Sequence, residues 1–257
     1  MNIVVCVKQV PDTAVERTLR SDGTLDRASL DGLINELDEY AIEEGLKIAE
    51  AHGGEVTILS MGPGKAAESI RKALSMGADK AIHVTDDGLA GSDALATSLA
   101  LAAALKQAGF DLVILGSEST DARTGMVPAM LAERLGVPQL TLASKVDING
   151  SDVTIRRVTD DGYAVVTAAL PAVVSVVEKI NEPRYPTFKG IMAAKKKPVQ
   201  VLTLGELSVD AGVGLAGAAT RVADFAARPP RSAGVIVKDE GDGGVKAAGF
   251  LAGRKFI

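Results

Sequence analysis

The chain is poor in the residues from which catalytic and metal sites are usually built. It has one cysteine and two histidines among 257 residues. A single cysteine excludes an intramolecular disulfide framework and fits a reducing compartment. Cys6 and His83 fall inside expected strands and His52 at an expected helix end, where structural roles are the better interpretation. Because the sequence shows no nucleophile–base pair and no metal-ligand cluster, we expect no catalytic centre and no metal.

The chain also lacks the long apolar runs of exported and membrane proteins. The apolar residues Ile3–Val7 are followed by a lysine, which is typical of a buried strand and not of a signal peptide. The most apolar later stretch, Leu95–Leu105, is too short to span a bilayer. We therefore expect a cytoplasmic protein.

Positive charge is not in excess either. There are 28 Lys+Arg against 33 Asp+Glu, a net charge of -5. A nucleic-acid binder needs a basic face to displace counterions, so we expect no nucleic-acid partner. The run Lys195–Lys197 has no interleaved aromatic residues and is better interpreted as a solvated or partner-facing patch.

What the sequence does have is an alternation of short apolar runs and longer helical patterns, within a composition that is 47% hydrophobic. This alternation predicts right-handed βαβ units, hence an α/β fold with a mostly parallel sheet and helices on both faces. The expected strands are Ile3–Val7, Val56–Ser60, Ala81–Thr85 and Leu112–Leu115. The expected helices are Glu36–Ala51, Lys65–Ser75, Asp93–Ala108 and Gly125–Leu135.

Local residues support these helix limits. Asn35 and Ser92 each precede an expected helix and are predicted to cap its first amides with their side chains. Gly77 is predicted to end a helix in a left-handed conformation.

After Val137-Pro138 the pattern changes to antiparallel strands. We expect strands at Ser144–Val146, Asp152–Val158 and Ala164–Ala168, with turns at Asn149-Gly150 and Asp160–Gly162, and a further apolar strand at Ala172–Val177. From Asn181 onward prolines and glycines interrupt the chain. The sequence thus predicts an α/β nucleotide-binding domain at residues 1–190 and an extended C-terminal arm at residues 191–257, laid across a partner.

One loop stands out as a candidate ligand site. Gly116–Gly125 reads GSESTDARTG and follows the carboxyl end of an expected strand, where open α/β sheets bind ligands. Its hydroxyls and amides suit a phosphate and its carboxylate a ribose, whereas the plainer alternative is a solvated connection. Met61–Gly64 is a weaker anion site of the same kind. Neither a Walker loop nor G-x-G-x-x-G follows the first strand.

Four regions give the chain a clear family resemblance. They are Ile3–Thr13 (IVVCVKQVPDT), Asn35–Glu50 (NELDEYAIEEGLKIAE), Ser60–Val84, and Ile155–Val176 continuing into Asn181–Lys197 (NEPRYPTFKGIMAAKKK). The chain resembles the β subunit of electron transfer flavoproteins, and the last region is the most specific.

The resemblance implies a carrier subunit with an adenine-nucleotide-binding α/β domain. In this family the α partner holds the FAD, and β holds a structural AMP and embraces α with its arm. The pair accepts electrons from flavin dehydrogenases, notably acyl-CoA dehydrogenases, and passes them to a membrane quinone oxidoreductase.

The resemblance also implies site residues. By position, the AMP pocket comprises Cys6, Asn35, Leu37, Asp38, Met61, Gly116, Ser119, Thr120, Asp121, Thr124, Gly125, Met126 and Val127. Phe188 takes the place of the family's aliphatic anchor for a dehydrogenase, with Ile191 and Met192 beside it. Three features depart from the family pattern: Glu36-Leu37 replaces Pro-Phe, Ala164 stands where Glu or Gln is usual, and the loop reads Asp121–Gly125 where many members carry Gln before the last two residues.

Two alternatives stay open at this point. In the electron-bifurcating variant of the family, the same pocket holds a second FAD. A nucleotide-binding regulatory module of the same α/β type has no electron role, and the segment Asn181–Lys197 weighs against it.

Overall fold

The computed structural model of the chain describes residues 1–209, 211–226, 229–231 and 233–257. These residues form two compact units, Met1–Ala223 and Asp224–Ile257. Four positions of the predicted arm, Asp210, Ala227, Arg228 and Ser232, lie outside the described residues.

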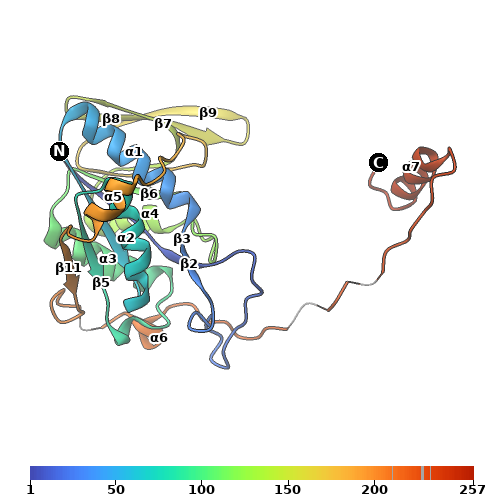
Figure 1. The fold of residues 1–257 in the computed structure, drawn as a ribbon, viewed down its shortest axis with the longest axis horizontal. Helices are drawn as coiled ribbons and strands as arrows, with labels where there is room; N and C mark the ends of the chain where they lie inside the picture. Colours follow the sequence, from blue (N-terminus) through green and yellow to red (C-terminus); the bar gives the residue numbers. More distant parts are fainter. Residues whose placement is uncertain (210, 227–228, 232) are drawn as a thin grey trace. The chain divides into compact units, whose positions relative to one another are not determined.

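Within the described residues, a nine-stranded sheet forms the centre of the first unit (Figure 1). The strand order is β11-β5-β4-β1-β6-β10-β7-β8-β9. From β11 to β7 neighbouring strands run parallel, and β7, β8 and β9 pair antiparallel. The predicted α/β fold, with a mostly parallel sheet and an antiparallel hairpin addition, is confirmed. The strands are β1 (Asn2–Cys6), β4 (Glu55–Met61), β5 (Lys80–Val84), β6 (Leu112–Gly116), β7 (Gln139–Asn149), β8 (Asp152–Thr159), β9 (Gly162–Ala169), β10 (Ala172–Val176) and β11 (Val199–Leu202).

Helices cover both faces of the parallel part, as predicted. On one face lie α1 (Glu36–His52) and α2 (Ala67–Met76), and on the other α3 (Ala94–Ala108) and α4 (Val127–Leu135). Strand β1 shows why: Ile3 and Val5 join the core with α1 and α2, whereas Val4 and Cys6 join the core with α3 and α4. A strand buried on both sides needs continuous rather than alternating apolar residues, which is what this run has.

Several short elements were not predicted. Strands β2 (Gln9–Pro11) and β3 (Gly32–Ile34) pair antiparallel within the long polar connection after β1. Helix α5 (Phe188–Ala194) packs against α2, and β11 pairs in parallel with β5. Short turns of helix occur at Gly64–Ala66, at Asp87–Leu89 and in α6 (Gly214–Gly217). The first unit therefore includes part of the segment predicted as an arm.

The second unit contains α7 (Gly243–Gly253). None of the described residues of α7 is buried, and Val235–Val237 are exposed as well. Packing of this unit on a partner stays a prediction. Among the described residues, no helix has both the length and the apolar composition required to cross a membrane.

Two predicted caps are wrong. Asn35 stands at the N-cap position of α1 but makes no side-chain cap bond, because its side chain is engaged with a distant loop. Helix α3 is capped by Asp93, whose carboxylate accepts from the Ala96 N–H at 2.9 Å, while Ser92 donates to the Leu89 carbonyl. Gly77 ends α2 with φ of 146°, in the region that favours glycine, as expected.

Candidate functional site

The sheet has a topological switch point between β1 and β6. From β1 the chain continues to β4 and β5 on one side, then returns to β6 on the other side of β1. Open α/β sheets bind ligands outside the carboxyl ends of their strands at such points. Lys8 follows β1 and residues 117–126, the switch-point loop, follow β6. The loop singled out in the sequence therefore lies where this fold offers a ligand site.

Asn35 fixes the backbone of the switch-point loop. Its Nδ2 donates to the Glu118 carbonyl at 2.9 Å, and its Oδ1 accepts from the Thr120 N–H at 3.1 Å. Asn35 itself is fully buried. A buried amide with both its donor and its acceptor in use is a strong constraint, since losing it leaves two backbone groups unpaired. The start of α1 and the loop are thus held together.

Gly116 completes this junction. A Cβ placed on Gly116 would lie 2.7 Å from Asp38 Oδ1 and 2.8 Å from the Leu37 carbonyl carbon. Only glycine permits the end of β6 to approach the first turn of α1 so closely. The predicted residues Leu37, Asp38 and Gly116 are therefore brought together.

Two cations surround the buried carboxylate of Asp121 in this loop. Lys8 Nζ donates to Asp121 Oδ1 at 2.8 Å and to Ser119 Oγ at 3.2 Å. Arg27 also pairs with Asp121, whose side chain is only 1% exposed. Burial alone would raise the pKa of Asp121, but the charges of Lys8 and Arg27 outweigh it and hold the pKa of that carboxyl well below its ordinary value. Asp121 is thus a fixed anion that orients two cations.

Asp38 behaves in the opposite way. Its Oδ2 accepts from the Lys8 N–H at 2.8 Å, yet burial raises the pKa of Asp38 to about 7 despite the hydrogen bonds from Lys8, Asn35 and Gly116. Burial also lowers the pKa of Lys8, and Asp121 offsets only part of that effect. The site therefore holds two carboxyl groups with very different proton affinities around one lysine.

The end of the loop suits an anion. No side chain of the described residues caps the first turn of α4, whose N-cap is Met126 and which has proline at its start. Free N–H groups and the positive end of the helix dipole favour a phosphate there. Thr120 Oγ1 is buried without a hydrogen-bond partner in the part of the chain that the structure describes. A buried hydroxyl of this kind calls for a ligand atom or a water. The residues present therefore fit a nucleotide phosphate.

The remaining predicted pocket residues line the same edge. Cys6 and Met61 end the neighbouring strands β1 and β4. Cys6 is buried, and burial raises the pKa of its thiol, so it is a neutral packing group. Thr124, Gly125 and Met126 are exposed, and Val127 begins α4. Contact of these residues with a nucleotide stays a prediction.

Sequence reasoning missed the cations of this site. Three basic residues come from the connection after β1: Lys8, Arg17 and Arg27. Arg17 donates to the Thr120 carbonyl at 3.2 Å. In the sequence this connection shows only a long polar composition. The available signal was its position: basic residues directly after the first strand of an α/β sheet reach the same edge as an acidic loop after another strand.

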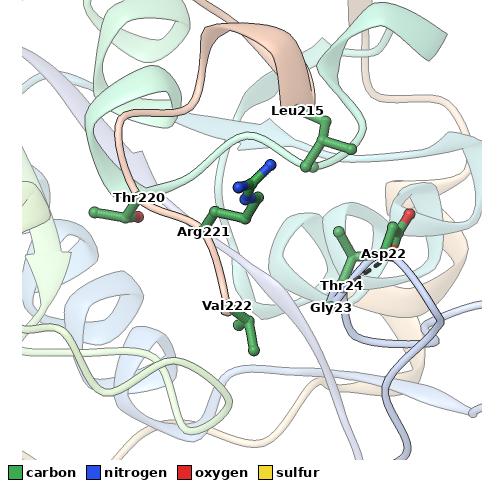
Figure 2. Close-up of a pocket in the computed structure, with 8 residues that line it drawn as sticks. Asp22, Gly23, Thr24, Leu215, Thr220, Arg221 and Val222 are labelled. Carbon is green, nitrogen blue, oxygen red and sulfur yellow. Dashed lines mark hydrogen bonds between the residues drawn. The ribbon is translucent and has the colours of Figure 1, made fainter. Parts of the chain in front are cut away.

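A separate cavity of about 330 Å³ lies where residues 211–223 run beside the turn at Asp22–Thr24. Figure 2 shows the Arg221 side chain extending into it between Leu215 and that turn. Asp93 holds this stretch, because its Oδ2 accepts from the N–H groups of Ala219 and Thr220. None of the predicted nucleotide residues lines the cavity, so we assign it to packing of the chain after β11.

The predicted docking residues lie on a different feature, residues 181–197, here called the exposed segment. Phe188 is 81% exposed, and Ile191 and Met192 of the same short helix, α5, are also exposed. Phe188 is therefore not part of the hydrophobic core of the fold. A groove of about 580 Å³ between α2 and α5 borders this surface, lined by Arg71, Lys72, Ile191 and Lys195 among others.

Known proteins of one kind match this chain. A model described as the electron transfer flavoprotein domain matches residues 22–207. The electron transfer flavoprotein subunit beta of Mycobacterium tuberculosis is 53% identical over 264 residues, with 100% of this chain and 99% of the relative covered. The Mycobacterium leprae subunit of the same name is 52% identical with the same coverage. The acryloyl-CoA reductase electron transfer subunit gamma of Anaerotignum propionicum is 35% identical, with 93% of this chain and 92% of the relative covered.

Proposed function

Because the chain belongs to the electron transfer flavoprotein family as a β subunit, we propose that it forms the nucleotide-holding half of a cytoplasmic heterodimeric electron carrier. The α partner holds the FAD that carries the electrons. The heterodimer accepts electrons from flavin dehydrogenases of the acyl-CoA dehydrogenase type and passes them to a membrane quinone oxidoreductase. In this proposal the chain supplies no catalytic centre of its own.

We place a structural AMP at the switch point. The observation that carries this proposal is the switch-point loop held by Asn35, with a Thr120 Oγ1 and a start of α4 to which no described side chain hydrogen-bonds. The amides around residues 124–127 would bind the phosphate, and Cys6 and Met61 would pack near the adenine. AMP here supplies no redox chemistry; it fills the edge of the sheet and fixes the loop.

Donor docking is assigned to the exposed segment. Phe188, Ile191 and Met192 present a small apolar surface that a dehydrogenase pocket can bury. The name of the Anaerotignum propionicum relative, an electron transfer subunit of an acryloyl-CoA reductase, supports a CoA-linked oxidoreductase as the partner class.

Residues of the second unit are assigned to the α subunit. The described residues of α7 expose Val245, Phe250 and Leu251, and such a helix needs a partner to bury them. The arm therefore fits a subunit interface better than an independent domain.

Nucleotide analysis of the purified heterodimer tests the proposal. The chain is coexpressed with its α partner, and the nucleotides released on denaturation are quantified. One FAD and one AMP per heterodimer are expected, and the β chain expressed alone should be colourless. Two FAD per heterodimer would replace the AMP proposal by the bifurcating arrangement. A stable monomeric β chain carrying one FAD would overturn the subunit assignment.

A further inference from the structure

We propose that Arg184 is a positioning residue for donor docking: its hydrogen bonds to α1 hold the exposed segment in the form that a donor recognises. The inference rests on the proposed function, since docking through Phe188 is itself proposed. In this account Arg184 does not contact the donor. It acts through the segment that it restrains.

Arg184 grips two carboxylates of α1 with a fork of hydrogen bonds. Its backbone N–H and Nε donate to Glu43 Oε2 at 3.1 and 2.7 Å, and Nη2 donates to Glu43 Oε1 at 3.0 Å. Nη1 and Nη2 donate to Glu50 at 2.6 and 3.2 Å. Glu43 and Glu50 lie two turns apart on one face of α1, so the planar guanidinium bridges both. Bidentate pairs of this kind fix geometry as well as adding energy.

Asn181 adds further hydrogen bonds between the exposed segment and α1. Its Nδ2 donates to the Tyr40 carbonyl and to Glu44 Oε2, both at 3.0 Å. Glu43 and Glu44 are both buried, which is costly for carboxylates without partners. These two helix residues therefore serve to receive residues 181–184, and this contact accounts for their burial.

A second anchor closes the other end of the segment. Lys197 Nζ donates to the carbonyls of Leu74, Gly77 and Ala78 at 3.0, 3.2 and 2.6 Å, at the carboxyl end of α2. Gly190 also touches α2, where a Cβ would lie 2.5 Å from the Ser75 carbonyl oxygen. Lys197 is thus a helix cap rather than a free charge of the lysine run.

The apolar side chains lie between the two anchors. Tyr185, next to Arg184, is 92% exposed, and Phe188 is 81% exposed. Apolar side chains on a loose segment would lose conformational entropy on docking, whereas a segment already held by its ends loses less. Restraint by Arg184 should therefore appear as affinity for the donor and not as a faster electron-transfer step.

The test uses the heterodimer and a purified acyl-CoA dehydrogenase reduced by its acyl-CoA substrate. Replacing Arg184 alone would strand the buried Glu43 charge, so Arg184→Met is combined with Glu43→Gln. We expect the KM for the heterodimer to rise about tenfold with kcat within about twofold of wild type, because preorganisation contributes to binding. Chymotrypsin should also cleave after Phe188 faster than in wild type.

A mutant cycle with Phe188→Ala separates positioning from direct contact. If Arg184 acts through the segment, adding the paired change to Phe188→Ala should raise KM by less than about twofold more. Arg134→Met is the matched control, since Arg134 donates to Ser98 Oγ at 2.8 Å between α3 and α4. It should leave KM unchanged.

The outcomes are distinguishable. An unchanged KM in the paired variant, or a full tenfold effect on top of Phe188→Ala, overturns the positioning role. If Phe188→Ala itself leaves KM unchanged in a heterodimer with normal FAD, the docking proposal fails, and this inference with it. Should the paired variant not fold, Glu50→Gln removes only the exposed half of the fork. A rise in KM of about threefold then supports the role, and no rise rejects it.

Discussion

The Asn35 side chain and the Thr120 backbone N–H are joined by a hydrogen bond of 3.1 Å, although 85 positions separate the two residues in the chain. Asn35 directly precedes α1, and Thr120 belongs to the switch-point loop after β6. This bond, with its companion to the Glu118 carbonyl, turns a loop into a fixed cradle beside β1. The geometry of the proposed AMP site therefore depends on Asn35 through the loop that it holds, even where Asn35 makes little direct contact with the nucleotide.

Asn35→Ala should loosen the switch-point loop. The change leaves the Thr120 N–H and the Glu118 carbonyl without their partner, at a cost of about 1–3 kcal/mol in the free energy of unfolding. AMP content of the purified heterodimer should fall well below one per heterodimer. Asn181→Ala is the matched control, because it removes another asparagine whose side chain joins distant segments, here residue 181 and helix α1. That variant should keep its AMP, and an equal loss in both would reject the cradle role.

Gly125→Leu should weaken nucleotide retention. Gly125 has φ of 62°, in the left-handed region, and a Cβ there would make only an ordinary 3.9 Å contact with the Ser117 carbonyl oxygen, so the substitution strains the backbone without a core clash. The strain costs about 1–2 kcal/mol. Gly136→Leu is matched, since Gly136 has φ of 68° and a Cβ there meets no close contact among the described residues, but Gly136 ends α4. Both variants should melt at similarly lower temperatures, and only Gly125→Leu should lose AMP. Equal AMP content in the two would remove Gly125 from the site.

The raised pKa of Asp38 predicts a pH dependence of stability. Its folded pKa is about 7, whereas the unfolded value is about 3.9. Between these values the folded state holds more protons, so this group's contribution to stability declines as pH rises from about 4 to about 7. The full effect is on the order of 4 kcal/mol. Asp38→Asn removes this titrating group. The melting temperature of the variant relative to that of wild type should therefore increase as pH is raised from 5 to 8.

Asp121→Asn provides the opposite case for that experiment. The pKa of Asp121 is lowered in the fold, so its contribution is present above the unfolded pKa and is lost only as pH falls below it. The destabilisation by Asp121→Asn should therefore stay constant between pH 5 and pH 8.

For Asp38, the contradicting result is a set of parallel pH profiles of melting temperature for wild type and Asp38→Asn. That result would show that Asp38 does not titrate in this window.

The parallel sheet and its helices were predictable because each depends on local composition. Runs such as Leu112–Leu115 are apolar throughout and favour strands covered on both faces. Topology then placed the loop after β6 at the ligand edge without any contact being known. These features follow from the order of elements along the chain.

The features that the sequence did not predict correctly depend on contacts between residues that are distant in the sequence. Asn35 is a residue type that commonly caps helices, but its side chain forms hydrogen bonds with the switch-point loop instead of with the first turn of α1. Lys8, Arg27 and Asp121 form one cluster only after three segments have met. Short elements were also missed. Strand β11 forms by pairing with the distant strand β5, which its own sequence does not reveal. Helix α7 is rich in glycine, which disfavours helix locally.

Phe188 is expected to contribute to donor docking and little to folding. At 81% exposure its side chain gives little to the stability of the fold, so Phe188→Ala should leave melting temperature, FAD and AMP content of the heterodimer close to wild type. Buried in a donor pocket, such an anchor contributes about 2 kcal/mol, or about thirtyfold in affinity. Electron transfer from an acyl-CoA dehydrogenase should therefore fall sharply at low heterodimer concentration.

Phe188→Leu decides what the anchor must be. Leucine keeps an apolar plug of the aliphatic kind and helix α5 tolerates it, so transfer should stay within a few-fold of wild type. If Phe188→Leu falls as far as Phe188→Ala, the donor pocket requires the aromatic ring itself. If Phe188→Ala loses stability and keeps its rate per folded molecule, the side chain supports the fold and the donor docks elsewhere. The ratio of the two rates at equal folded concentration therefore measures how much of the docking energy comes from apolar volume alone.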